Sequence, residues 1–319
     1  MLTALCQGLR ASLGLLHKQD IQTAAQALKV ADTWNQAKVL AGDDCAAIPD
    51  GDGYLLLAAE GMLPQFVETD PWFAGWSAVM VNVSDIYAMG GRPIAIVDTL
   101  WSQSTATAQA LWQGMQAAAQ TYNVPIVGGH TNCHSTYDGL SVAILGRATT
   151  LISSFAAQPG DCLLVATDFR GKLHPHYPFW NAATTADPVH LRQQLAILPE
   201  LAETGLCQAG KDISNGGIVG TLLMLLETSG CGATLDLDRV PCPTGLSLEQ
   251  WLVSFPSFGF LLSVRPDRVE AVRSQFQQQE LVCEVVGEVE SGLELVLRSG
   301  NEAIVFWDLA EQEFTGFRG

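Results

Sequence analysis

VNVSDIYAMGGRP, residues 81–93, decides how the first half of the chain folds. Asn82 and Asp85 stand there inside an apolar run. The apolar residues of this stretch and the tryptophans upstream recur at helical spacing, so we predict one helix over residues 72–89. Asn82 and Asp85 are three residues apart and therefore share one side of that helix. The Gly-Gly-Arg-Pro segment then ends the helix and starts a strand at 92–101.

Alternating strands and helices are predicted on both sides of this helix, which indicates an α/β or α+β protein. The other elements predicted in the first half are one or two helices within residues 1–40, strands at 54–62, 124–132 and 140–149, and a helix at 104–122. A small-residue linker and a Pro-Gly-Asp turn near 150–160 predict two domains, residues 1–150 and 151–319. The second half is predicted to hold a strand at 162–167, an irregular stretch at 172–188, helices at 189–205 and about 216–229, and strands at 232–240, 258–266, 282–290 and 293–299.

Composition limits the class of protein and its partners. The chain has 319 residues, 48% of them hydrophobic, and no apolar run approaches the roughly 18 residues of a membrane span, so we expect a cytoplasmic protein. The net charge of −17 argues against nucleic acid or an anionic membrane as a partner. The eight cysteines form no Cys-x-x-Cys pair, which fits neither a disulfide framework nor a zinc ribbon. An acidic chain that handles phosphates would need metal cations.

Acidic side chains at the ends of apolar segments predict a shared cation site. Magnesium prefers oxygen ligands and is usually held by one or two carboxylates beside a phosphate. The alternative is that each acid is only a cap or a turn residue. The candidate metal ligands are Asp43 and Asp44 in AGDDCA, Glu60 at a strand end, Asp85, and Asp212 in KDISNGG before a predicted helix.

Two further motifs offer phosphate or metal contacts. VGGHTNCH, residues 127–134, predicts a glycine turn whose amides cradle phosphate, and its two histidines and cysteine make zinc a less favoured alternative. GLCQAGKD has the glycine and lysine spacing of a P-loop, but Asp212 stands where Ser or Thr is required, so we reject that motif. We expect Asp212 or Ser214 to cap the following helix, whose N-terminus is a ready phosphate site.

Five ordered motifs, GDDCA, VNVSDIYAMGGRP, VPIVGGHT, QPGDCLLVATD and DISNGG, resemble the PurM-like superfamily. This superfamily includes aminoimidazole ribonucleotide synthetase, selenophosphate synthetase and thiamine-monophosphate kinase, and the nearest local resemblance is to the last. The resemblance implies a PurM-like fold with an N-terminal dimerising α/β domain and a C-terminal α/β domain. It further implies a homodimer that binds ATP and Mg²⁺ and activates or phosphorylates an oxygen of a small molecule.

The resemblance also implies roles for individual residues. Asp44 and Asp85 match metal-binding acids, Asp43 is the neighbouring acid, and Asp212 matches an acid of the second-domain loop that we expect to be catalytic. The residues expected to contact ATP are Gly42, Asn82, Gly128, Gly129, His130, Ser214 and Asn215. The polar side of the 72–89 helix is then expected to face the nucleotide, with Asp85 on a metal ion.

Departures from the kinase pattern leave the specific activity open. His130 and Asn215 stand where thiamine-monophosphate kinase has aspartates, and Glu60 follows two alanines in place of Ser-Thr-Asp. The leading hypothesis is therefore a Mg²⁺-dependent, ATP-using enzyme with an unidentified acceptor. The alternatives are thiamine-monophosphate kinase itself, or a nucleotide-binding protein that has lost the chemistry. We expect the acceptor site to be lined by HPHYPFWN, residues 174–181, and by the last 70 residues.

Overall fold

The chain folds into two compact units, seen in a computed structural model that describes residues 2–28, 33–34, 37–38 and 40–318. The small unit consists of Cys45–Thr150 and Thr184–Pro199, and the large unit of the chain up to Asp44, Leu151–Ala183 and Glu200 onward. One change of unit falls after Thr150, at the predicted division. The segment up to Asp44, however, packs with the large unit, and Thr184–Pro199 packs with the small one.

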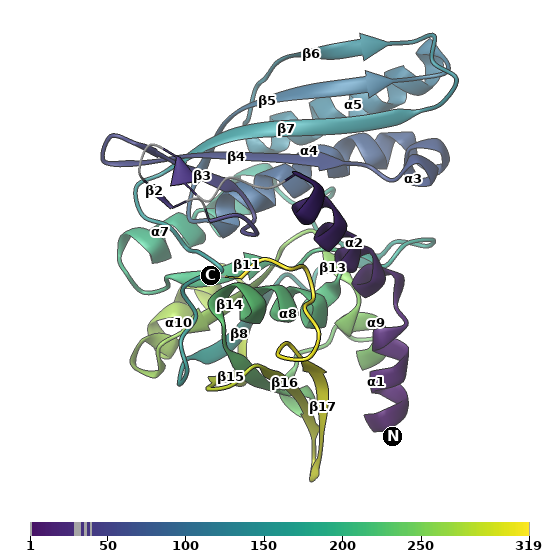
Figure 1. The fold of residues 1–319 in the computed structure, drawn as a ribbon. Helices are drawn as coiled ribbons and strands as arrows, with labels where there is room; N and C mark the ends of the chain where they lie inside the picture. Colours follow the sequence, from purple (N-terminus) through teal and green to yellow (C-terminus); the bar gives the residue numbers. More distant parts are fainter. Residues whose placement is uncertain (1, 29–32, 35–36, 39, 319) are drawn as a thin grey trace. The chain divides into compact units, whose positions relative to one another are not determined.

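The small unit is a five-stranded sheet with helices on one face (Figure 1). Its strand order is β3-β4-β7-β5-β6, in which β5 and β6 are parallel and the other neighbours antiparallel. The strands are β3 (Ala46–Asp50), β4 (Gly53–Gly61), β5 (Arg92–Trp101), β6 (Ile126–Asn132) and β7 (Gly139–Ala148). The helices are α3 (Pro64–Thr69), α4 (Pro71–Ala88), α5 (Thr105–Tyr122) and α6 (Pro188–Leu195). Helix α4 packs against α5 and against β4, β5 and β7.

Helix α4 is the helix predicted over 72–89, and this prediction is confirmed. Asp70 caps it by accepting a hydrogen bond from the Phe73 amide, and Pro71 occupies its first turn, where no amide proton is needed. The chain leaves the helix at Gly90, whose φ of 72° lies in the left-handed region, before β5 begins. The helix packs against both the sheet and α5, so almost every side chain on it is buried, including Asn82 and Asp85.

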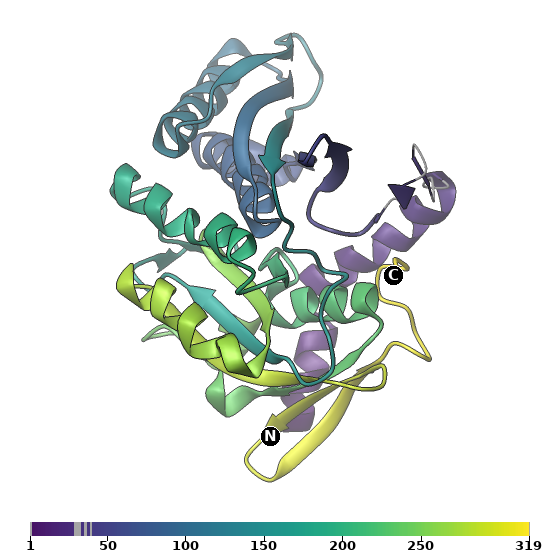
Figure 2. The same cartoon turned by 90° about the vertical axis from the view of Figure 1, so that its left-hand side faces the viewer.

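The large unit is built on a seven-stranded sheet of order β11-β14-β8-β15-β12-β16-β17. These strands are β8 (Cys162–Thr167), β11 (Ala209–Asp212), β12 (Gly232–Asp236), β14 (Gly259–Val264), β15 (Val282–Glu290), β16 (Glu294–Ser299) and β17 (Glu302–Asp308). Its helices are α1 (Leu2–Arg10), α2 (Leu13–Leu28), α8 (Gly217–Ser229), α9 (Leu248–Leu252) and α10 (Val269–Gln278), and α7 (Ile197–Glu203) spans the change of unit. Short strands complete it: β1 (Thr33–Trp34) with β2 (Ala37–Lys38), and β9 (Lys172–Leu173), β10 (Phe179–Asn181) and β13 (Phe255–Pro256). The hydrophobic core gathers around helix α8, which is buried along its length except at Ser229. Figure 2 shows the β16–β17 hairpin at the yellow, C-terminal end of the chain.

Several predicted elements differ from the structure. The helix predicted at 189–205 is two helices, α6 and α7, because Pro199 has no amide proton to donate to the Leu195 carbonyl. The strand predicted at 232–240 ends at Asp236, whose side chain accepts from the Asp238 amide and turns the chain into a 3-10 helix. The helical prediction for residues 1–40 holds for α1 and α2, but residues 33–34 and 37–38 form the β1–β2 pair. None of the helices in the described residues combines the length and the hydrophobicity that crossing a bilayer requires.

Candidate functional site

Three charged side chains form a buried cluster in the large unit. The Lys211 ammonium lies 2.5 Å from Asp44 Oδ1 and 3.9 Å from Asp43 Oδ1, and all three side chains are at most 5% exposed. The same ammonium donates to the Gly42 carbonyl at 3.4 Å. Gly42 has a φ of 114°, and a β-carbon at this position would overlap the Phe317 side chain, so a larger residue here would be strained.

The Asp43 carboxylate is held by the segment that enters the large unit from β7. Its Oδ2 accepts from the Ser153 hydroxyl at 2.6 Å and from the Ser154 amide at 3.1 Å. Its Oδ1 accepts from the amides of Ser154 and Asp44, each at 3.1 Å. Both oxygens of Asp43 therefore already have protein donors.

Strand β11 positions the cation of this cluster. It is an edge strand that pairs with β14, with Lys211 opposite Leu261 and Asp212 opposite Phe260. Burial lowers the pKa of Lys211, but the carboxylates of Asp44 and Asp43 outweigh this effect, so the pKa is raised and the ammonium is retained. Asp212 was expected in a loop; it is instead the buried last residue of β11, and its amide donates to Asp44 Oδ2 at 3.2 Å.

The turn after β11 does not cap α8 with a side chain, contrary to expectation. The N-cap residue is Gly216, and the chain enters the helix through Gly217, whose φ is 63° and whose amide donates to the Ser214 carbonyl. The Ser214 amide donates to the Thr221 hydroxyl, but within the described residues the Ser214 hydroxyl has no partner. Asn215 is exposed beside it. Asn215 is therefore accessible to a ligand of the large unit, whereas the Ser214 hydroxyl is buried.

The remaining predicted acids belong to the small unit. Asp85 is buried on α4, one turn after the fully buried Asn82. The Asn82 side-chain amide donates to the Ala78 carbonyl at 2.8 Å, and its Oδ1 has no partner in the described part of the chain. Glu60 is exposed near the end of β4, where its carbonyl accepts from the Ser141 hydroxyl.

The predicted phosphate-cradling glycine turn is not a turn. Gly128, Gly129 and His130 lie inside strand β6 and pair in parallel with Val97, Asp98 and Thr99 of β5. Glycine at 129 is required there because the Asp98 carboxylate and carbonyl occupy the space a side chain would take. His130 lies near the Trp101 ring, with 6.0 Å between ring centroids. In the described residues, no three or more histidine, cysteine or acidic side chains are grouped so that they could hold a metal ion.

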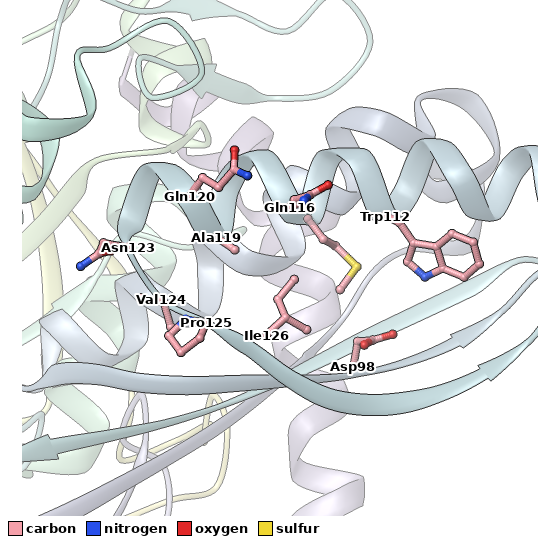
Figure 3. A pocket seen from close by; sticks show the side chains of 10 residues that line it. Asp98, Trp112, Gln116, Ala119, Gln120, Asn123, Val124, Pro125 and Ile126 are labelled. Atoms are coloured by element: carbon pink, nitrogen blue, oxygen red, sulfur yellow. The ribbon is translucent and has the colours of Figure 1, made fainter.

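A cavity of about 830 Å³ lies between α5 and strands β5 and β6 of the small unit (Figure 3). Asp98 reaches into it from the sheet, and Trp112, Gln116 and Gln120 reach it from the helix. Burial raises the pKa of the Asp98 carboxyl, whose Oδ2 has no partner in the described residues. None of the residues predicted as ATP or metal ligands lines this cavity.

The Asp43–Asp44 pair, as it stands, does not fit a Mg²⁺ ion. Such an ion requires a near-octahedral set of oxygens at about 2.0–2.1 Å. Asp43 accepts hydrogen bonds on both oxygens, and Asp44 is bound to the Lys211 ammonium on one and to the Asp212 amide on the other. The pair is thus a satisfied ion cluster.

Comparison with known sequences identifies the family. The AIR synthase related protein N-terminal domain matches residues 42–148, and its C-terminal domain matches residues 158–299. Together the two matches cover more than half of the chain. The chain belongs to the AIR synthase related family. The PurM-like relationship and the two-domain PurM-like fold inferred from the sequence are thereby confirmed.

Relatives in this family extend over the whole chain. An uncharacterized protein of Synechocystis is 57% identical over 100% of this chain and 99% of its own length. The structure of T. maritima PurL complexed with ATP matches with a TM-score of 0.74 at 19% identity, covering 92% of this chain and 50% of the PurL chain. The structure of AaThiL complexed with AMPPCP and TMP matches with a TM-score of 0.68 at 19% identity, covering 88% of this chain and 94% of the ThiL chain. This chain therefore spans about half the length of PurL and nearly all of ThiL.

Lys211 is the residue of this site that the sequence motifs did not identify. This lysine was considered only as part of the P-loop motif in GLCQAGKD, which we rejected. The usable signal was charge: adjacent acids next to apolar segments need a counter-ion when they are buried, and lysine is scarce in this chain. No pattern of spacing relates residue 211 to residues 43 and 44, because the contact joins segments far apart in sequence.

Proposed function

We propose that this protein is an ATP-dependent enzyme that activates or phosphorylates an oxygen atom of a small-molecule acceptor. The support is its membership of the AIR synthase related family and its fold, which it shares with PurL and ThiL, proteins whose structures contain ATP or AMPPCP. ATP is then a substrate that enters with Mg²⁺, and we place the reaction in the cytoplasm.

The observation that carries this proposal is the buried polar side of α4. A buried aspartate, and an asparagine whose Oδ1 has no partner in the described residues, are costly inside a helix–sheet layer unless they serve a ligand. We propose Asp85, Glu60 and Asp212 as the acids that hold the Mg²⁺ of the nucleotide. We propose Gly42, Asn82, Gly128, Gly129, His130, Ser214 and Asn215 as the ATP contacts. When bound, the metal ion neutralises negative charge on the phosphates.

Asp85→Asn tests this proposal. The substitution keeps the size of the side chain and removes its charge, so nucleotide turnover should fall by at least about tenfold while the fold is retained. Phosphate release from ATP is the measurement, with circular dichroism as the check on folding. Asp52→Asn is the matched control, since Asp52 is an aspartate of the same unit whose side chain is 95% exposed. Full turnover by Asp85→Asn would show that Asp85 is not a metal acid.

Thiamine-monophosphate kinase is the second candidate, favoured by the match to ThiL over 94% of that chain. Against it stand His130 and Asn215 in place of two kinase aspartates. Incubation with thiamine monophosphate and MgATP decides between the two, because only this kinase forms thiamine diphosphate. A third outcome, thermal stabilisation by AMPPCP without turnover of ATP on any acceptor, would indicate a nucleotide-binding protein that has lost the chemistry.

We further propose that the small unit forms a homodimer through the open face of its sheet. Residues directly opposite each other on neighbouring strands point to the same face of a sheet. Leu57 of β4 is opposite Leu145 of β7, and Ala143 of β7 is opposite both Ala59 of β4 and Val97 of β5, so all five lie on one face. The centre of this face is apolar, and Leu57 and Val97 are each more than 40% exposed, whereas α4 packs on the other face. An apolar sheet face of this kind is typical of a surface that meets a second copy of the chain.

A further inference from the structure

The Lys211 ammonium is enclosed by one short segment of the chain. Its three described oxygen neighbours are the Gly42 carbonyl at 3.4 Å, Asp43 Oδ1 at 3.9 Å and Asp44 Oδ1 at 2.5 Å. The oxygens of Asp44 and Gly42 lie within hydrogen-bond distance of this three-proton donor, and Asp43 Oδ1, at 3.9 Å, adds the attraction of a second negative charge. The segment 42–44 is thus folded around a cation that the protein itself supplies.

The two carboxylates have little left to offer a second cation. Protein donors occupy Asp44 Oδ2 and both oxygens of Asp43, while Asp44 Oδ1 contacts the ammonium. A divalent ion would have to break at least one of these contacts and expel the ammonium, because two cations sharing one buried carboxylate repel strongly at low dielectric. Lys211 is itself buried, so an ammonium displaced from the two carboxylates would lose the negative charges that stabilise it.

We propose that Lys211 is the resident cation of the Asp43–Asp44 pair, and that these carboxylates bind no divalent ion while its ammonium is in place. The ion cluster then links β11 to residues 42–44, which precede β3 in the chain, without any metal. The ion that accompanies ATP is held by other acids, which in the proposed function are Asp85, Glu60 and Asp212. Only this last statement rests on the proposed function.

The test counts bound Mn²⁺, a spectroscopic stand-in for Mg²⁺, by electron paramagnetic resonance of the free ion. Lys211→Met vacates the cluster and leaves two buried carboxylates, so it should bind one Mn²⁺ more per chain than the wild-type protein. Lys211→Arg keeps a cation and should bind the wild-type number. Lys172→Met is the matched control, because Lys172 is an exposed lysine of the same unit. Equal Mn²⁺ counts for the wild type and a folded Lys211→Met would overturn the proposal.

A second variant keeps the inference testable if Lys211→Met does not fold. Asp44→Asn removes one of the two carboxylates, and the proposal requires its Mn²⁺ count to equal that of the wild type. Loss of one Mn²⁺ in Asp44→Asn would show that the pair is a metal site after all. These counts are made with and without AMPPCP. If AMPPCP fails to bind, the proposed ATP-dependent function fails, while the counts without nucleotide still decide the role of Lys211.

Discussion

Gly129 is a single residue whose side chain the sheet cannot accommodate. A β-carbon there would lie 2.6 Å from the Asp98 carbonyl oxygen and would also overlap the Asp98 carboxylate. Gly129→Ala should therefore lower the free energy of unfolding by about 1–3 kcal/mol, the usual cost of overpacking. Gly128→Ala is the matched control, because its β-carbon would meet only Val97 Cγ1 at 3.9 Å. Urea denaturation measures both, and equal stabilities would contradict the close approach of β5 and β6.

Asp98 should make stability depend on pH in a defined direction. Burial raises the pKa of this carboxyl in the folded state, so the native protein holds its proton more tightly than the unfolded chain does. Its contribution to stability is therefore greatest below the unfolded pKa and declines as pH rises through the folded one. Asp98→Asn should gain stability relative to the wild type between about pH 4 and pH 7, as measured by thermal denaturation at each pH. A constant difference over that range would show that Asp98 is not titrating in a buried site.

The limit of sequence reasoning at this scale is visible in the same residues. The acids were found because a carboxylate beside an apolar segment is unusual, and Asp43, Asp44, Asp85 and Asp212 are all buried at their side chains or as whole residues. The glycines were assigned to a turn because two adjacent glycines usually make one. Gly129 is instead explained by the Asp98 carboxylate of the neighbouring strand, a contact that no local pattern encodes, whereas the space at Gly128 would admit a side chain.

Helix α8 shows how one element fixes another far along the chain. Glu227, buried near its C-terminus, accepts from the amides of Phe314 and Thr315 at 2.7 Å and from the Thr315 hydroxyl at 2.5 Å. Glu227→Gln places an amide group opposite some of these donors. We expect a loss of about 2 kcal/mol, the range for hydrogen bonds to a charged group.

The release of the C-terminal segment is the more specific readout of Glu227→Gln. Limited proteolysis should cut the chain after residue 308 faster in this variant than in the wild type, because the amides of 314–316 lose their anchor. Glu302→Gln is the control, since Glu302 is an exposed glutamate of the neighbouring strand β17. Unchanged cleavage would mean that other contacts, such as that of the Gln22 side chain with the Glu313 and Phe314 carbonyls, hold the segment alone.

Helices and strands with a long, regular hydrophobic pattern could be predicted from the sequence. A strand that forms only because it pairs with another strand could not. Helix α4 and strands β5 and β8 were predicted to within one residue at each end, because their hydrophobic patterns are long and their ends carry Gly, Pro or a capping residue. Strand β11 was missed because it has four residues and carries a lysine and an aspartate. It exists through its ladder with β14, and its charges are satisfied by the segment 42–44.

At the scale of the whole molecule, the open sheet face predicts the state of association. Val97 and Leu57 lie on that face at 43% and 46% exposure, and replacing both with lysine would bury two unpaired charges in a dimer interface. The double variant Leu57→Lys, Val97→Lys should therefore be a monomer under conditions where the wild type is a dimer. Light scattering coupled to size-exclusion chromatography measures the mass. Val189→Lys is the control, because Val189 is 54% exposed on α6 of the same unit and away from this face. A wild-type protein that is already monomeric would refute the homodimer and leave the apolar face to another partner.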